Sequence, residues 1–180
     1  MSRNKQKGRA VMTVRTMAVA AMLTGMSVVI GIFCKTVLNL GNGMFRITFE
    51  NLPILLTGLL YGPFVGGMVG ICSDLISYLL SAQSYPPNLL VTAGAALVGI
   101  VSGALSRALR GKGRNARVIL SCSLAHLVGS VVVKSIGLYQ FYGIMILWRV
   151  PLYMLIGALE IFVLCLLMGR DSFRRLTDFE

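Results

Sequence analysis

Four isolated cations are the residues best able to do chemistry in this sequence: Lys35, Arg46, Lys134 and Arg149. The chain has seventeen Lys and Arg residues, and all the others fall into three clusters. Glu50 is the one acid that we expect beside these four, so the set carries an excess of positive charge. Ammonium and guanidinium groups bind carboxylates through charge-assisted hydrogen bonds. The set therefore predicts a site for a carboxylate-bearing ligand, although a single Lys at a helix end is equally explained by a position at a membrane surface.

Two acids deep inside apolar runs, Asp74 and Glu160, form a second set of candidates. A carboxylate in such surroundings pairs with a cation, accepts N–H bonds from a bound heterocycle, or orders the packing of helices. We assign Asp74 to the ligand site, and we assign Glu160 and the single His126 to packing. Trp148 is the only tryptophan and directly precedes Arg149. It provides either an aromatic wall for a flat ligand or an anchor at the membrane surface.

Signatures of enzymes and of cofactor sites are absent from the sequence. The segment Gly111-Lys112-Gly113 lacks the spacing and the following Ser or Thr of a P-loop, so that motif for binding ATP is missing. No cluster of His and carboxylates has the spacing of a metal site, and there is no serine elbow. The four cysteines form no C-x-x-C pair. We therefore expect neither catalysis nor a cofactor, and active transport would need another subunit or an ion gradient.

The composition places these residues in a membrane protein. Of 180 residues, 56% are apolar and only 13% are charged, and the mean hydropathy is +0.81. Apolar runs long enough to span a bilayer recur along the whole chain. They predict an all-α bundle of six transmembrane helices in a single domain, 1–180, with boundaries at 10–33, 52–61, 64–81, 89–109, 118–139 and 145–168. The second helix is too short to cross alone, so we expect it to be tilted and extended or to cross only part of the bilayer.

The three basic clusters, at residues 3–15, 107–117 and 170–175, predict the orientation. With six crossings, both termini and the loop between the fourth and fifth helices share one side, which the positive-inside rule makes the cytoplasm. Residues 1–9 and 170–180 are then cytoplasmic tails. No aromatic residues interleave with the clusters, so we expect membrane lipid and not nucleic acid beside them. The loops expected outside, near the four isolated cations, are 34–51, 82–88 and 141–144.

Small residues recur at four-residue spacing, which lets helix backbones approach closely in a membrane. One set predicts internal packing of the third and fourth helices: Gly62, Gly66, Gly70, Ala95, Gly99 and Gly103. The first helix has two competing small faces. One consists of Ala18, Ala21 and Gly25, and the other of Ala20, Thr24, Ser27 and Gly31. We expect one face to pack inward and the other to meet a partner protein.

Several consecutive motifs resemble a known family. Residues 46–54 have the pattern R-I-x-F-x-x-x-P-I, a Tyr-Gly-Pro turn follows at 61–63, and a Gly-rich helix leads to Asp74. These features resemble the substrate-binding S components of energy-coupling-factor (ECF) vitamin transporters. Tyr85-Pro86-Pro87, residues 134–139 and Arg149-Val150-Pro151 resemble the folate group of that family. Ile32-Phe33 stands where that group commonly has Arg-Phe, and Asn88-Leu89 stands where it has Gly and an aromatic residue.

The resemblance implies a protein of the bacterial plasma membrane that captures folate or a related pterin from outside. It also implies delivery through a transmembrane coupling subunit driven by two cytoplasmic ATPases. Ala21 and Gly25 correspond to the family's A-x-x-x-A docking motif, with the equally small Gly in place of the second Ala, so with Ala18 they form the expected coupling surface. The residues expected to bind substrate are Lys35, Arg46, Glu50, Asp74, Tyr85, Lys134, Tyr139, Trp148 and Arg149.

Two alternatives remain open from the sequence. Within the same class, the cargo is another vitamin such as pantothenate, which is a smaller carboxylate. From a different class comes a small membrane enzyme or scaffold whose outer cations hold lipid phosphate.

Overall fold

The computed structural model describes residues 14–37, 39–40, 45–46, 48–80, 88–143 and 149–169. Within these residues the chain is helical apart from a short hairpin. In chain order the elements are α1 (Val14–Val37), β1 (Asn39–Leu40), β2 (Phe45–Arg46), α2 (Asn51–Tyr61), α3 (Pro63–Leu80), α4 (Leu89–Ala108), α5 (Arg114–His126), the π-helix η1 (Leu127–Val133), α6 (Lys134–Tyr142) and α7 (Arg149–Gly169). The two strands pair antiparallel, with Asn39 opposite Arg46 and Leu40 opposite Phe45.

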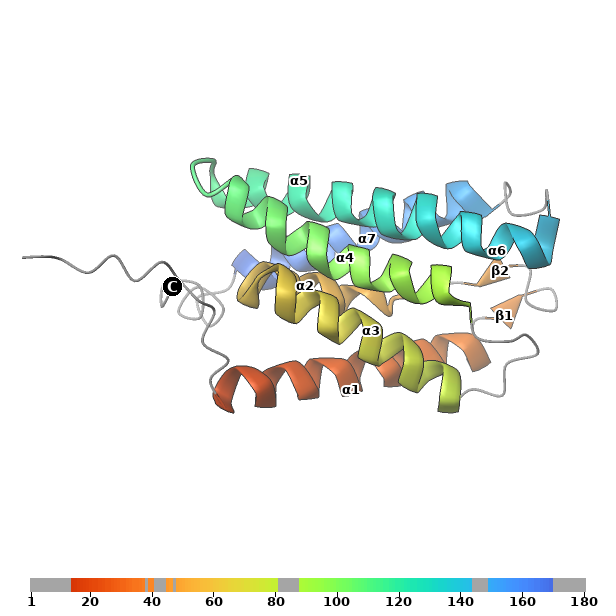
Figure 1. Cartoon of the computed structure of the whole chain (residues 1–180). Coiled ribbons are helices and arrows are strands. Elements are labelled where there is room, and N and C mark those ends of the chain that lie inside the picture. The colour runs from red at the N-terminus through yellow and green to blue at the C-terminus, as the bar shows by residue number, and fades with distance from the viewer. Residues whose placement is uncertain are drawn as a thin grey trace, which may run out of the picture.

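The helices form one bundle in which the chain direction alternates (Figure 1). Because α5, η1 and α6 follow one another without a break, the described elements make the six passes that the sequence predicts. The start of α1, the end of α7 and the α2–α3 and α4–α5 turns lie at one end, which we call the turn end. The β1–β2 hairpin lies at the other, the hairpin end. The middle basic cluster, 107–117, is therefore at the turn end, and the cytoplasmic location of that end stays a prediction.

Length and surface both suit a membrane. Five helical spans, with α5 and its continuation counted as one, are long and apolar enough to cross a bilayer. Only 22% to 44% of the most apolar window of each span is buried inside the protein. Most of this apolar surface therefore faces outward, as it does in a bundle surrounded by lipid. The sixth pass, α2, is apolar but too short to cross a bilayer by itself.

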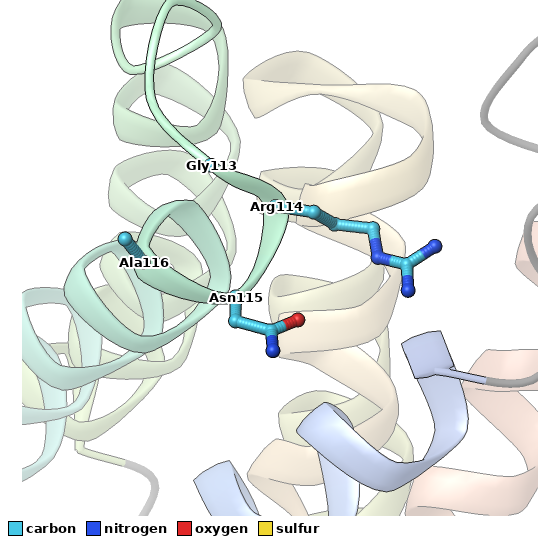
Figure 2. A pocket seen from close by; sticks show the side chains of 4 residues that line it. All are labelled: Gly113, Arg114, Asn115 and Ala116. Carbon is cyan, nitrogen blue, oxygen red and sulfur yellow. The ribbon is translucent and has the colours of Figure 1, made fainter.

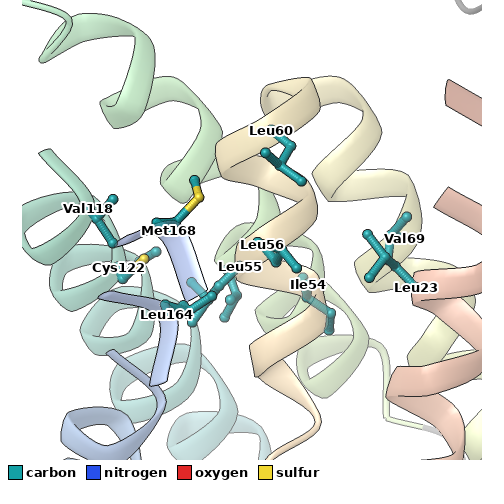
Figure 3. Close-up of a cluster of buried hydrophobic side chains, with 12 residues drawn as sticks. Leu23, Ile54, Leu55, Leu56, Leu60, Val69, Val118, Cys122, Leu164 and Met168 are labelled. Carbon is teal, nitrogen blue, oxygen red and sulfur yellow. The ribbon is translucent and has the colours of Figure 1, made fainter. Parts of the chain in front are cut away.

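The short helix α2 lies in the centre of the bundle. It contacts α1, α3, α4, α5 and α7, and eight of its eleven residues are buried. Eleven residues rise only about 16 Å, roughly half of the hydrocarbon thickness of a bilayer. Other helices cover α2, and irregular backbone at membrane depth is tolerated where protein covers it. Figure 3 shows Ile54, Leu55 and Leu56 of α2 in the hydrophobic core, between Leu23 of α1 on one side and Leu164 of α7 on the other.

The Tyr61-Gly62-Pro63 motif forms the tight turn between α2 and α3. Gly62 has a φ of +89°, a conformation that favours glycine, and its N–H donates to the Gly58 carbonyl over 2.9 Å. Pro63 begins α3, where its missing N–H leaves no helical hydrogen bond unmade. The Arg107 Nη2 donates to the Tyr61 carbonyl over 3.3 Å and so ties α4 to this turn.

Small residues bring α3 and α4 into backbone contact, as their spacing predicts. A Cβ on Gly66 would lie 2.7 Å from the Gly99 carbonyl oxygen, and a Cβ on Gly99 would collide with the backbone of Gly66. Gly70 meets the Ala95 backbone in the same way, and Gly103 meets the turn before α3. These residues pack internally, so that prediction is confirmed.

Three local features differ from the predicted boundaries. The first helix continues to Val37, so residues 34–37 are helical and not part of the outer loop. The fifth helix begins at Arg114, runs on to Tyr142 and contains the π-helical η1. The β1–β2 hairpin has only two residues in each strand, too few to give a period-two pattern in the sequence. The predicted tails, 1–9 and 170–180, lie outside the described residues.

Candidate ligand site

Three charged side chains from distant parts of the sequence meet near the hairpin end. Lys35 is in the last turn of α1, Glu50 directly precedes α2, and Lys134 begins α6. The Lys134 Nζ lies 3.2 Å from Glu50 Oε1, and the Lys35 Nζ lies 3.6 Å from Glu50 Oε2. The three side chains are 9% to 17% exposed, so water screens these charges only weakly. Glu50 thus bridges two cations that the sequence places among the ligand-binding candidates.

Lys134 has a second acceptor in addition to Glu50. Its Nζ donates to Asn51 Oδ1 over 3.0 Å, and Asn51 Nδ2 in turn donates to Ser130 Oγ over 3.1 Å. Lys134, Asn51 and Ser130 are at most 7% exposed. A buried charge needs such partners because its loss of water is costly. The chain of bonds fastens the start of α2 to η1 and α6.

Asp74 makes a polar contact that is separate from the Glu50 group. The Thr92 Oγ1 of α4 donates to Asp74 Oδ2 of α3 over 2.6 Å. Within the described ranges, no Lys, Arg or His nitrogen lies within 4.0 Å of the Asp74 carboxylate. Its environment therefore differs from that of Glu50, whose carboxylate lies between two ammonium groups.

A narrow, closed cleft with no room for a water molecule lies between Glu50 and Asp74. It is lined by Ser27, Glu50, Ile54, Ser73, Asp74, Ser77 and Ala95. Two carboxylates and three hydroxyls make this lining rich in hydrogen-bond acceptors, so it suits a ligand group that carries N–H donors. Pockets for small molecules usually enclose about 300–1,000 Å³, so the lining side chains have to move apart before the cleft can hold a ligand. The neighbouring segments 81–87 and 144–148 lie outside the described residues.

The remaining candidates lie outside the cleft lining, outside the described residues, or in segments where only the backbone is described. Arg46 lies in β2 and Arg149 begins α7, and the structure describes only the backbone of these two residues. Tyr85 and Trp148 lie outside the described residues. Tyr139 is 57% exposed on α6 and is not among the residues that line the cleft. Ligand binding by all nine candidate residues stays a prediction.

Sequence reasoning missed most of the hydroxyl and amide groups of the site. Asn51, Ser73 and Ser77 are each at most 4% exposed and lie on inward faces of α2 and α3. The available signal was their spacing, because Asn51 follows Glu50 directly, and the two serines flank Asp74 on the same helix. Small polar residues are common in membrane helices, so that signal alone does not separate a ligand site from packing.

His126 and Glu160 form a separate buried pair. The His126 Nδ1 lies 3.1 Å from Glu160 Oε2, and its Nε2 donates to the Tyr153 carbonyl over 2.9 Å. Glu160 is fully buried, and its contact with the imidazole is at ion-pair distance without good hydrogen-bond alignment. The pair joins α5 to α7 and does not line the cleft, which fits the packing role that we predict for both residues.

The two small faces of α1 have different surroundings. Ser27 and Gly31 are buried, and Ala20 and Thr24 are half-buried, so this face packs inward. The opposite face, made by Ala18, Ala21 and Gly25, is exposed. A Cβ on Gly25 would meet no atom within 4 Å. Within the described part of the chain, this second face therefore has open space beside Gly25.

A shallow hollow of about 480 Å³ lies at the opposite end of the bundle. Gly113, Arg114, Asn115 and Ala116 line it at the start of α5 (Figure 2). It adjoins the basic cluster of the turn end and includes none of the residues of the cleft. We therefore do not count it as part of the candidate ligand site.

Comparison with known proteins identifies the family. The family model "ECF transporter, substrate-specific component" matches residues 15–173, which is most of the chain. The chain belongs to this family. The resemblance inferred from its motifs is thus confirmed, and the family is a transporter component that binds substrate, not an enzyme. Comparison with curated proteins gave no match.

Solved structures share the fold of this S component. One is FolT bound with folic acid, with a TM-score of 0.65 and 23% identity over 84% of this chain and 90% of FolT. Another is the S component of a bacterial ECF transporter, with a TM-score of 0.61 and 20% identity over 92% of this chain and 96% of that one. At these identities the similarity shows a common membrane helical bundle and does not by itself show a common ligand.

Proposed function

We propose that this S component captures folate or a related pterin from outside a bacterial plasma membrane. The observation that carries the proposal is the acceptor-rich cleft at the hairpin end, in a chain that has the fold of FolT bound with folic acid. Folate joins a flat pterin ring, which carries N–H donors, to a tail with two carboxylates. The two halves of such a ligand need acceptors at one place and cations at another.

Asp74 is the residue that suits the ring. Its carboxylate lines the cleft, accepts a hydrogen bond from Thr92 and has no cation at ion-pair distance within the described residues. A charged acceptor bound to ring N–H groups contributes about 1.5–3 kcal/mol per contact. Lys35, Arg46 and Arg149 are the cations proposed for the tail, with Tyr85, Tyr139 and Trp148 as ring contacts.

We propose further that the vitamin is delivered through a transmembrane coupling subunit and two cytoplasmic ATPases. The family supports this proposal, because the matched family is the substrate-specific component of ECF transporters, and the sequence contains no P-loop of its own. The exposed face Ala18, Ala21 and Gly25 is the proposed docking surface, because small side chains let a second helix backbone approach closely. This face is available without rearranging the bundle.

The cargo is tested by what the protein carries. The protein is purified in mild detergent, extracted with solvent, and the co-purified small molecules are identified by mass spectrometry. A folate or another pterin is the expected result, confirmed by titration in nanodiscs with the fluorescence of Trp148. Pantothenate would replace folate as the cargo, and phospholipid alone, with no folate binding, would contradict a vitamin-binding role.

A further inference from the structure

The two lysines that share Glu50 are held in different ways. Lys134 is 7% exposed and is fixed by two oxygens, Glu50 Oε1 at 3.2 Å and Asn51 Oδ1 at 3.0 Å. Lys35 approaches Glu50 Oε2 only to 3.6 Å, which is an ion-pair distance too long for a good hydrogen bond. The same carboxylate therefore makes a tight contact with one cation and a loose contact with the other.

The position of each lysine in the bundle accentuates this difference. Lys134 stands where η1 passes into α6, and its side chain packs against Gly94 of α4, where an added Cβ would come within 2.7 Å of the Lys134 Cγ. Lys35 is one turn or less from the end of α1, next to the hairpin end. A lysine at a helix end has a long flexible stem that can redirect its ammonium group. Both side chains are mostly buried, 13% exposed for Lys35 and 9% for Lys134, so the two lysines differ in their contacts and in their distance from a helix end.

From these contacts we propose that Glu50 is an exchangeable internal counter-ion for Lys35. In the ligand-free protein the two lysines share the single negative charge of Glu50. When a carboxylate-bearing ligand arrives, Lys35 exchanges the Glu50 carboxylate for a carboxylate of the ligand, and Glu50 remains with Lys134. Lys134 is then a positioning residue, and Lys35 is the cation that meets the ligand. This assignment rests on the proposed function, since it takes the ligand to be a vitamin with a carboxylate tail.

The exchange has a consequence for selectivity. A ligand without a carboxylate leaves the Lys35–Glu50 pair intact and gains nothing from Lys35. A ligand with a carboxylate has to compete with Glu50, so part of its attraction to Lys35 is offset by the pair that it breaks. Removing the charge of Glu50 abolishes this competition and should strengthen the binding of the carboxylate ligand only.

The ligand test compares Glu50→Gln, Lys35→Met and the double variant in nanodiscs by Trp148 fluorescence. The amide oxygen introduced by Glu50→Gln still accepts from Lys134 but gives Lys35 no counter-charge. We expect Glu50→Gln to bind folate about three- to tenfold more tightly and Lys35→Met about tenfold more weakly. In the double variant the gain should vanish. A pterin without carboxylates should gain no affinity from Glu50→Gln, whether or not Lys35 is present. Equal weakening of both ligands by Glu50→Gln would make Glu50 a ring contact and overturn the proposal.

A ligand-free test separates this inference from the choice of cargo. Lys134→Met should lower the unfolding temperature in detergent by several degrees, because it leaves Asn51 and Glu50 buried without their partner. Lys35→Met should lower it by less than Lys134→Met does, because Lys35 has one contact at 3.6 Å whereas Lys134 has two shorter ones. Asn51→Ala removes only the second acceptor and should fall between them, which keeps the test usable if Lys134→Met does not fold. Equal losses of unfolding temperature in the Lys35 and Asn51 variants would refute the proposed difference between the two lysines. If the three variants show the expected order but the protein does not bind folate, only the choice of cargo is refuted.

Discussion

The three acids within the described residues differ in what surrounds them. Glu50 sits between two ammonium groups, Asp74 accepts from a hydroxyl, and Glu160 lies against an imidazole. A carboxylate that already has a cation has less to gain from the N–H groups of a ligand. Asp74 is therefore the acid whose loss should affect binding of a pterin ring most directly.

Replacing Asp74 with Asn should weaken folate binding roughly tenfold or more, because a charge-assisted contact contributes about 1.5–3 kcal/mol. The substitution keeps the shape of the side chain and an oxygen that can accept from Thr92. Glu160→Gln is the matched control, since it makes the same acid-to-amide change away from the cleft. Titrations of the two variants by Trp148 fluorescence measure the difference. Unchanged affinity in Asp74→Asn, with the fold intact, would remove Asp74 from the site.

Residue types in the sequence predict that four charged residues share a region but not how they pair. Lys35, Glu50, Asp74 and Lys134 are candidates because charges are costly at membrane depth, and the structure brings them close together. The ion pairs themselves depend on three-dimensional packing of α1, α2 and α6. An isolated Asn or Ser carries no such cost, so Asn51 and the cleft serines gave only a weak signal.

At the scale of elements, small-residue spacing is the most informative pattern. The Gly and Ala repeats of α3 and α4 predicted their close contact because a missing side chain is the condition for backbone approach. The π-helical η1 and the hairpin were not predictable in this way. A π-helix differs from an α-helix by one extra residue in its turn, and no residue type is specific to it. The centre position of α2 was also not evident, since its length alone allowed a tilted or a partial crossing.

Gly99→Ala should separate α3 from α4, because the new methyl group would collide with the backbone of Gly66. Overpacking of this kind costs about 1–3 kcal/mol, which corresponds to a fall in unfolding temperature of roughly 2–12 °C for a chain of this size. Gly25→Ala is the control, since a Cβ there meets no atom within 4 Å in the described residues. Thermal unfolding in detergent measures both. A loss that is equal in the two variants would contradict internal packing at Gly99.

At the scale of the whole molecule, the features proposed for ligand binding, orientation and docking lie at the two ends of the bundle and along the side formed by α1. The hairpin end has the acceptor-rich cleft, and the turn end has the basic cluster of residues 107–117. The outward face of α1 exposes small residues, whereas the inward face of the same helix contributes Ser27 to the cleft. One helix therefore lines the proposed ligand site and presents the proposed docking surface on opposite faces. A bound ligand and a coupling subunit could then be sensed by the same helix.

Enlarging the outward face of α1 should separate transport from binding. Ala21→Leu and Gly25→Leu place bulk where the bundle has room, so the isolated protein should fold and bind folate with wild-type affinity within about twofold. In cells the same variants should lose most folate uptake, because a larger side chain prevents close approach of a partner helix. Ala158→Leu on the exposed face of α7 is the control for added bulk facing lipid, and it should leave uptake unchanged. If binding and uptake fall together, the α1 face serves the fold of the bundle, and if uptake persists, the coupling subunit docks elsewhere.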